Sequence, residues 1–73
     1  IEGTEIAVCI KRTNNGFRLN LRSNGKADVA EVAMKFGGGG HIKAAGATLD
    51  FDSTEKAERA VIDACKRALD KII

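Results

Sequence analysis

The sequence predicts an α+β fold in which two helices pack on one face of a small mixed β-sheet, in the order strand, strand, helix, glycine loop, strand, helix. Three observations support this prediction. Apolar residues alternate with polar ones in the first third of the chain, recur at helical spacing in two later stretches, and are interrupted by turn-forming and glycine-rich segments. The 73 residues, 44% of them hydrophobic and 30% charged, suffice for one small domain.

The first two strands are expected to form a hairpin. Ile6, Val8 and Ile10 alternate with their neighbours, which predicts a strand from about Glu5 to Arg12 with one well-buried face. Asn14-Asn15-Gly16 is typical of a tight hairpin turn, because these residues tolerate positive φ.

The second strand alternates three apolar residues with three polar ones and ends at Arg22 and Ser23. Side chains on a strand point to opposite faces in turn, so the two sets lie on opposite faces of the sheet. The apolar set, expected to pack under the helices, is Phe17, Leu19 and Leu21; the polar set, expected on the open face, is Arg18, Asn20 and Arg22.

The first helix is expected from about Val29 to Phe36. Asp28 followed three residues later by Glu31 resembles a helix-start capping box, and Gly37 occupies the position at which a left-handed residue ends many helices. The following glycine run therefore begins at a helix end.

The second half of the chain is expected to form a third strand and a long helix. The segment Ile42–Ala45 is long enough for one helical turn at most, and the alternating Ala47, Leu49 and Phe51 predict the strand. Asp52 with Glu55 repeats the capping signature. The apolar stripe of the helix is Ala57, Ala60, Val61, Ala64, Cys65, Ala68, Leu69 and Ile72.

Four consecutive glycines, Gly37 to Gly40, followed by His41 are the most informative segment. Glycine lacks a Cβ and adopts positive φ without strain, so successive amides of such a run can converge on an anion or a nucleotide. The run is also compatible with a flexible loop. The Walker spacing is absent, because Lys43 comes after His41 and Ile42 and no Ser or Thr directly follows it. The dinucleotide fingerprint is absent, because Ile42 and Lys43 occupy the positions where its third glycine would be.

Composition narrows the function classes. The net charge of +2 permits a polyanionic partner without requiring one. Cys9 and Cys65 are expected to be buried small hydrophobes, and they are too few for a disulfide framework or a zinc site. Neither a membrane span nor a signal peptide is recognised, so a cytoplasmic location without a membrane partner is expected. Because Ile1 is not methionine, we expect residues 1–73 to be one domain of a longer protein.

Three segments resemble a known family. They are Leu21-Arg22-Ser23-Asn24-Gly25, the helix Asp28–Ala33, and Gly37-Gly38-Gly39-Gly40-His41 with Ala44-Ala45-Gly46. Together they closely resemble the DHH-associated type 1 domain, the C-terminal substrate-binding module of DHH-family phosphoesterases, and in particular the nanoRNase group of oligoribonucleases and pAp phosphatases. The resemblance covers nearly the whole chain.

The resemblance implies a partner domain and a division of labour. An N-terminal DHH catalytic domain in the same polypeptide would hold divalent manganese and hydrolyse phosphate esters of short RNA or DNA oligonucleotides, of pAp or of cyclic dinucleotides. This chain has no Asp-His-His sequence and His41 is its one histidine, so no catalytic residue, metal or cofactor is assigned to it. The residues implied to contact substrate are Arg22, Ser23, Gly37, Gly38, Gly39, Gly40 and His41.

Two other interpretations stay open. The first is a non-catalytic RNA-binding module similar to the C-terminal domain of alanyl-transfer-RNA synthetases, against which the pairing of Arg22 with Ser23 argues. The second is an interaction domain that forms a homodimer, with the long helix pairing with another copy through Ala57, Val61, Ala64 and Ala68.

Overall fold

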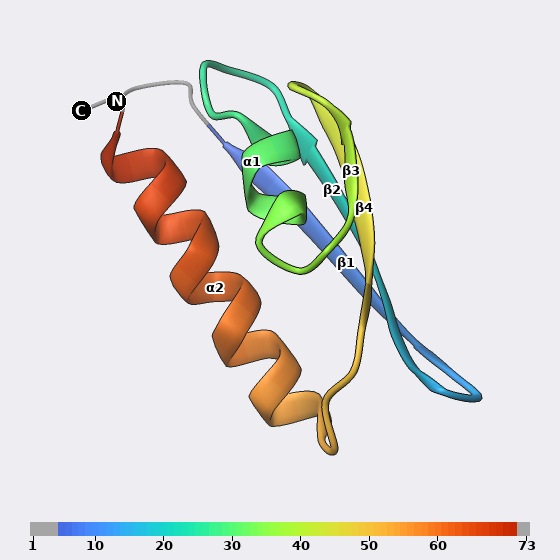
Figure 1. Ribbon diagram of the computed structural model, residues 1–73. Helices are drawn as coiled ribbons and strands as arrows, with labels where there is room; N and C mark the ends of the chain where they lie inside the picture. The colour runs from blue at the N-terminus through green and yellow to red at the C-terminus, as the bar shows by residue number, and fades with distance from the viewer. Residues whose placement is uncertain (1–4, 72–73) are drawn as a thin grey trace.

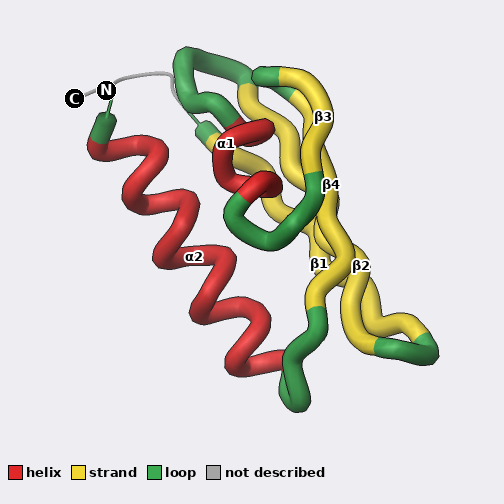
Figure 2. Tube along the Cα trace, in the orientation of Figure 1, coloured by secondary structure: helices red, strands yellow, loops and turns green. Residues whose placement is uncertain are grey.

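A computed structural model describes residues 5–71 as one antiparallel sheet with both helices on the same side of it (Figures 1 and 2). The strands lie in the order β1-β2-β4-β3. The elements are β1 Ile6–Thr13, β2 Gly16–Ser23, α1 Val29–Met34, β3 Gly39–His41, β4 Ala44–Leu49 and α2 Thr54–Asp70. The predicted α+β class, with helices covering one face, is confirmed.

The sheet differs from the prediction in two respects. Every strand pairing is antiparallel, so the sheet is not mixed. The segment expected to be a glycine loop and a helical turn is a second hairpin, in which Gly39–His41 pairs with Ala44–Gly46 around a turn at Ile42 and Lys43. A run of glycines shows no alternation of apolar and polar residues, so the sequence pattern did not predict a strand here.

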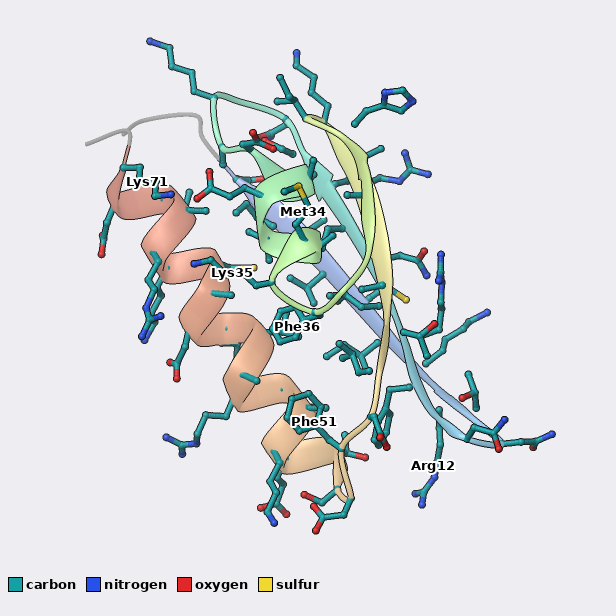
Figure 3. The ribbon with its side chains drawn as sticks, viewed as in Figure 1. Arg12, Met34, Lys35, Phe36, Phe51 and Lys71 are labelled. Carbon is teal, nitrogen blue, oxygen red and sulfur yellow. The ribbon has the colours of Figure 1, made fainter. Side chains whose placement is uncertain are left out.

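The core lies between the sheet and the helices. Phe17, Leu19 and Leu21 of β2 are buried, as predicted, and contact Val32 of α1 and Val61 of α2 within one apolar cluster. Phe36 and Phe51, both labelled in Figure 3, are half-buried and pack against this cluster. Because the helices cover only this face, the opposite face of the sheet is open.

Three boundaries differ from those expected. Helix α1 ends at Met34, with Lys35 as its C-terminal cap, two residues before Phe36. Helix α2 is capped by Ser53, whose Oγ accepts a hydrogen bond from the Lys56 N–H at 3.2 Å, and not by Asp52. Strand β4 begins at Ala44 and ends at Leu49, so that Phe51 follows the strand.

The two cysteines have different environments. Cys65 is buried, as expected, and its burial raises the pKa of the thiol above the ordinary value. Cys9 is exposed, so its predicted burial is wrong. Alternation along β1 sends Cys9 to the open face of the sheet, and Val8 on the helix-facing side is itself 43% exposed because β1 is an edge strand.

The apolar stripe of α2 faces the sheet. Ala57, Val61, Ala64 and Ala68 are buried in the core, so these residues cannot pair with a second copy of the chain. The proposed mode of dimerisation through this stripe is therefore wrong. Ile72, expected at the end of the stripe, lies outside the described residues. Within residues 5–71, neither helix combines the length and the apolar character needed to cross a bilayer.

Candidate phosphate-binding face

The side of the sheet turned away from the helices, here called the outer face, carries the predicted Arg22 and His41 together. Strand β4 lies between β2 and β3, and its Ala44 pairs with Arg22 of β2 on one side and with His41 of β3 on the other. Residues opposite one another share a face, and two interstrand spacings amount to about 10 Å. Both side chains are exposed. An imidazole and a guanidinium thus flank an alanine in one row across the sheet.

The next row on the outer face is almost bare of side chains. Gly39 of β3 is opposite Gly46 of β4, which is in turn opposite Asn20 of β2. With Ala44 these two glycines form a floor of exposed or half-buried backbone between His41 and β2. A flat or charged group can approach such a floor closely, because no Cβ projects from Gly39 or Gly46.

Three of the four consecutive glycines are required by the fold itself. Gly37 follows α1 with a φ of +80°. A Cβ on Gly38 would overlap the carbonyl oxygen of Gly46 and come within 2.7 Å of the Cα of Ala47. Gly40 combines a φ of +145° with the carbonyl oxygen of Ala44 at 2.6 Å from a built Cβ. These three positions need no ligand to explain them.

Gly39 is the exception within the run. A Cβ built on it meets nothing within 4 Å, and its φ lies outside the positive range. The fold would therefore accept a side chain here, and the absence of one keeps the floor beside His41 open. Of the four glycines predicted to contact a ligand, Gly39 is thus the one whose lack of a side chain the fold does not explain.

The side chains of Ser23 and Arg22 lie on opposite faces of the sheet, although both residues border the hollow at the end of β2. Its side chain is only 7% exposed on the helix-facing side of β2, where Oγ accepts a hydrogen bond from the Gly25 N–H at 3.3 Å. The Ser23 backbone N–H donates to the carbonyl of Lys43 at 3.0 Å. In this conformation Ser23 shapes the turn after β2, and its hydroxyl does not face the row that contains Arg22 and His41.

A hollow of about 420 Å³ lies at the end of β2, next to Arg22. Its lining combines two cationic side chains, one carboxylate and small or polar groups. These residues are Glu5, Ala7, Arg22, Ser23, Asn24, Lys43 and Ala44. The carboxylate of Glu5 accepts a hydrogen bond from the Asn24 side-chain amide at 3.4 Å. The cationic groups of the hollow are Arg22 and Lys43.

The sheet is free of acidic residues within the part of the chain that the structure describes. No Asp or Glu lies in β1, β2, β3 or β4, whereas the outer face carries Lys11, Arg18 and Arg22. The ion pairs among the described residues, Lys56 with Asp52 and Lys71 with Glu31, involve the helices and the segment before α2. The strands therefore give the outer face a positive charge, and Glu5, just before β1, places one carboxylate in the hollow beside Arg22.

Arg18 and Asn20 join the candidate site, although neither was assigned to it from the sequence. An Nη atom of Arg18 lies 3.0 Å, and the Asn20 Oδ1 3.4 Å, from the position of a Cβ built on Gly46. Both polar groups thus border the glycine floor. Alternation along β2 predicted that they face outward, but only the pairing of β2 with β4 places them beside Gly46.

The polar side chains of this face have the chemistry of an anion-binding site and not of a metal centre. Guanidinium, ammonium and imidazole groups with amide donors are suited to phosphate oxygens. Between residues 5 and 71, no group of three or more His, Cys, Asp and Glu side chains is arranged to hold a metal ion. A catalytic metal does not fit the residues present on this face.

Comparisons with known proteins agree with the resemblance. A sequence model described as the DHHA1 domain matches residues 1–70. The "Bifunctional oligoribonuclease and PAP phosphatase NrnA" of Thermus thermophilus is 35% identical over 69 residues, which cover 94% of this chain and 21% of that relative. The proteins of the same name from Mycoplasma pneumoniae and Mycoplasma genitalium are 55% and 50% identical over 40 residues, covering 55% of this chain and 12% of each relative. The chain thus spans about a fifth of the length of the first of these relatives.

Proposed function

This chain belongs to the DHHA1 domain family, and on that basis we propose that it is the substrate-binding domain of a DHH-family phosphoesterase. Its ligands are short oligonucleotides or nucleotides such as pAp, which it holds by their phosphates on the outer face. The relatives named as oligoribonucleases and PAP phosphatases support this choice of ligand class. Cyclic dinucleotides share the same chemistry.

The observation that carries the proposal is the row His41, Ala44 and Arg22. A guanidinium donates two parallel hydrogen bonds to a phosphate, and an imidazole donates one when neutral or two when protonated. Because Ala44 between them is small and Gly39 has no side chain, a phosphate can lie on the sheet within reach of both groups. Lys43, in the turn beside them, adds a further cation.

In this proposal the chain binds and orients the ester, and another domain cleaves it. An N-terminal catalytic domain of the same polypeptide holds manganese, which supplies an activated water for phosphoester hydrolysis. The donors on the outer face fix the position of the phosphates relative to that domain. Both cysteines of this chain are free, which fits the reducing conditions of the cytoplasm, where we place the reaction.

The test is a residue-resolved NMR titration of this chain with pAp and with a short oligoribonucleotide. We expect the amides of Arg22, Gly39 and His41 to shift first, and Arg22→Ala or His41→Ala to weaken binding of both ligands. Arg59→Ala removes a cation from the exposed side of α2 and is the matched control. Shifts confined to α2, or equal affinities for Arg22→Ala and the control, would refute the assignment of the outer face.

A further inference from the structure

We propose that the outer face has a second phosphate-contact position, formed by Arg18 and Lys11, which binds a different phosphate of the same strand from the one held by Arg22 and His41. This inference rests on the proposed function. It adds two residues, Arg18 and Lys11, that the family motifs do not assign to the site.

The spacing along β2 sets the length of ligand. Arg22 and Arg18 point to the same face and are four residues apart, which corresponds to about 14 Å along a strand. A stacked single strand rises about 3.4 Å per nucleotide, so the two arginines are separated by about four stacked nucleotides and by fewer when the strand is extended. The two phosphates of pAp, attached to one nucleoside, are too close together to reach both positions.

The second position contains two cations placed directly opposite each other. In the register of β1 and β2, Lys11 is the partner of Arg18, and both are exposed on the outer face. Like charges directly opposite in an antiparallel pair destabilise the sheet. Neither residue takes part in the ion pairs found among residues 5–71. A bound phosphate would offset this repulsion.

Arg18 connects the second position to the glycine floor. Its guanidinium lies so close to Gly46 that a side chain at that position would crowd it at 3.0 Å. Gly46 is opposite Gly39, which is two residues from His41 along β3. A strand that leaves the row of His41 and Arg22 can therefore cross bare backbone before it reaches Arg18.

The contacts are expected to be with phosphates and not with bases. The three aromatic rings of the chain, Phe17, Phe36 and Phe51, are buried or packed against the core on the other side of the sheet. The outer face thus offers cations but no aromatic platform for stacking. Binding should depend on ionic strength and be insensitive to base sequence.

The experiment compares two ligands with five forms of this chain. The ligands are pAp and a five-nucleotide oligoribonucleotide, titrated by NMR at two salt concentrations. The proteins are the unchanged chain, Arg18→Ala, Arg22→Ala and the control Arg59→Ala, with Arg18→Lys added to test rescue by charge alone. Because Arg18 is exposed, the Arg18→Ala variant should keep its fold, and its amide spectrum should resemble that of the unchanged chain.

We expect Arg18→Ala to weaken binding of the five-nucleotide ligand about three- to tenfold and to weaken binding of pAp by a smaller factor, because pAp is too short to reach from the row of His41 and Arg22 to the second position. The slope of log affinity against log salt should fall by about 0.7, the value for one lost phosphate contact on a single strand. Arg18→Lys should restore part of the affinity.

Two negative results are distinguishable. If Arg22→Ala weakens both ligands while Arg18→Ala equals the control, the second position is wrong and the proposed function stands. If Arg22→Ala leaves both affinities unchanged, the proposed function itself fails, and the inference fails with it.

Discussion

Gly39 distinguishes what the fold requires from what a ligand requires. Its neighbours Gly38 and Gly40 are fixed by backbone contacts with β4, and Gly37 by its positive φ. Among these four glycines, only Gly39 combines open space for a Cβ with a φ outside the positive range, and it lies on the same face as His41 and Arg22. A substitution here changes the surface offered to a phosphate without disturbing the packing beneath it.

Alanine at Gly38 should therefore reduce stability, whereas alanine at Gly39 should reduce ligand binding. Gly38→Ala is expected to lower the free energy of unfolding by about 2 kcal/mol or more, because the new Cβ overlaps the Gly46 carbonyl. Gly39→Ala is expected to change it by less than about 0.5 kcal/mol and to weaken binding of pAp. Urea denaturation measures the first effect and NMR titration the second.

The pair of variants also provides its own control. A destabilised Gly39→Ala would mean that the fold needs this glycine after all, and the structural reading of the position would be wrong. A stable Gly39→Ala that binds pAp as well as the unchanged chain would remove the glycine floor from the site.

At the scale of elements, α2 holds the sheet by a narrow stripe of small residues. Its buried positions are mostly alanines, and Val61 is the one residue of this helix among the largest fully buried side chains. The next residue, Ile62, is 49% exposed and lies near Val8 at the edge of the sheet. Truncation of a buried residue of α2 should therefore lower the free energy of unfolding much more than truncation of its exposed neighbour.

Val61→Ala and Ile62→Ala test this alternation. Truncation of the fully buried Val61 should lower the free energy of unfolding by about 2 kcal/mol, since both methyl groups leave the core and a cavity remains. Ile62→Ala should cost less than about 1 kcal/mol, because half of its surface is already in water. Equal losses in chemical denaturation would show that Ile62 is covered in solution and that the edge near Val8 is not open.

Local patterns predicted most elements but not their assembly. The hairpin of β1 and β2, the start of α1 and the outward direction of Arg18, Asn20 and Arg22 followed from alternation, turn residues and the Asp28 cap, whereas the cap of α2 was misplaced by one residue. Strand β3 was missed because glycines carry no period. The pairing of β4 between β2 and β3 brings His41 and Arg22 into one row, and no spacing along the chain encodes that register.

At the scale of the whole molecule, the two sides of the sheet have different tasks. The helices and the apolar side chains of β2 form a thin core in a chain of 73 residues, and a core of this size gives modest stability. The outer face contributes side chains that repel one another and bury little. Ligand binding to this face should therefore contribute a large fraction of the stability of the folded chain.

Thermal unfolding with and without ligand measures this coupling. A ligand that binds only the folded chain stabilises it by about 1.4 kcal/mol at ten times its dissociation constant. In a domain of this size that free energy corresponds to a rise in Tm of about 5 to 10 °C. We expect this rise with a five-nucleotide oligoribonucleotide, a smaller rise at the same concentration with pAp, and almost none for Arg22→Ala. Sulfate at equal ionic strength controls for general stabilisation by anions. An equal rise for Arg22→Ala would show that the anions act on the folded chain without using the row that Arg22 and His41 form.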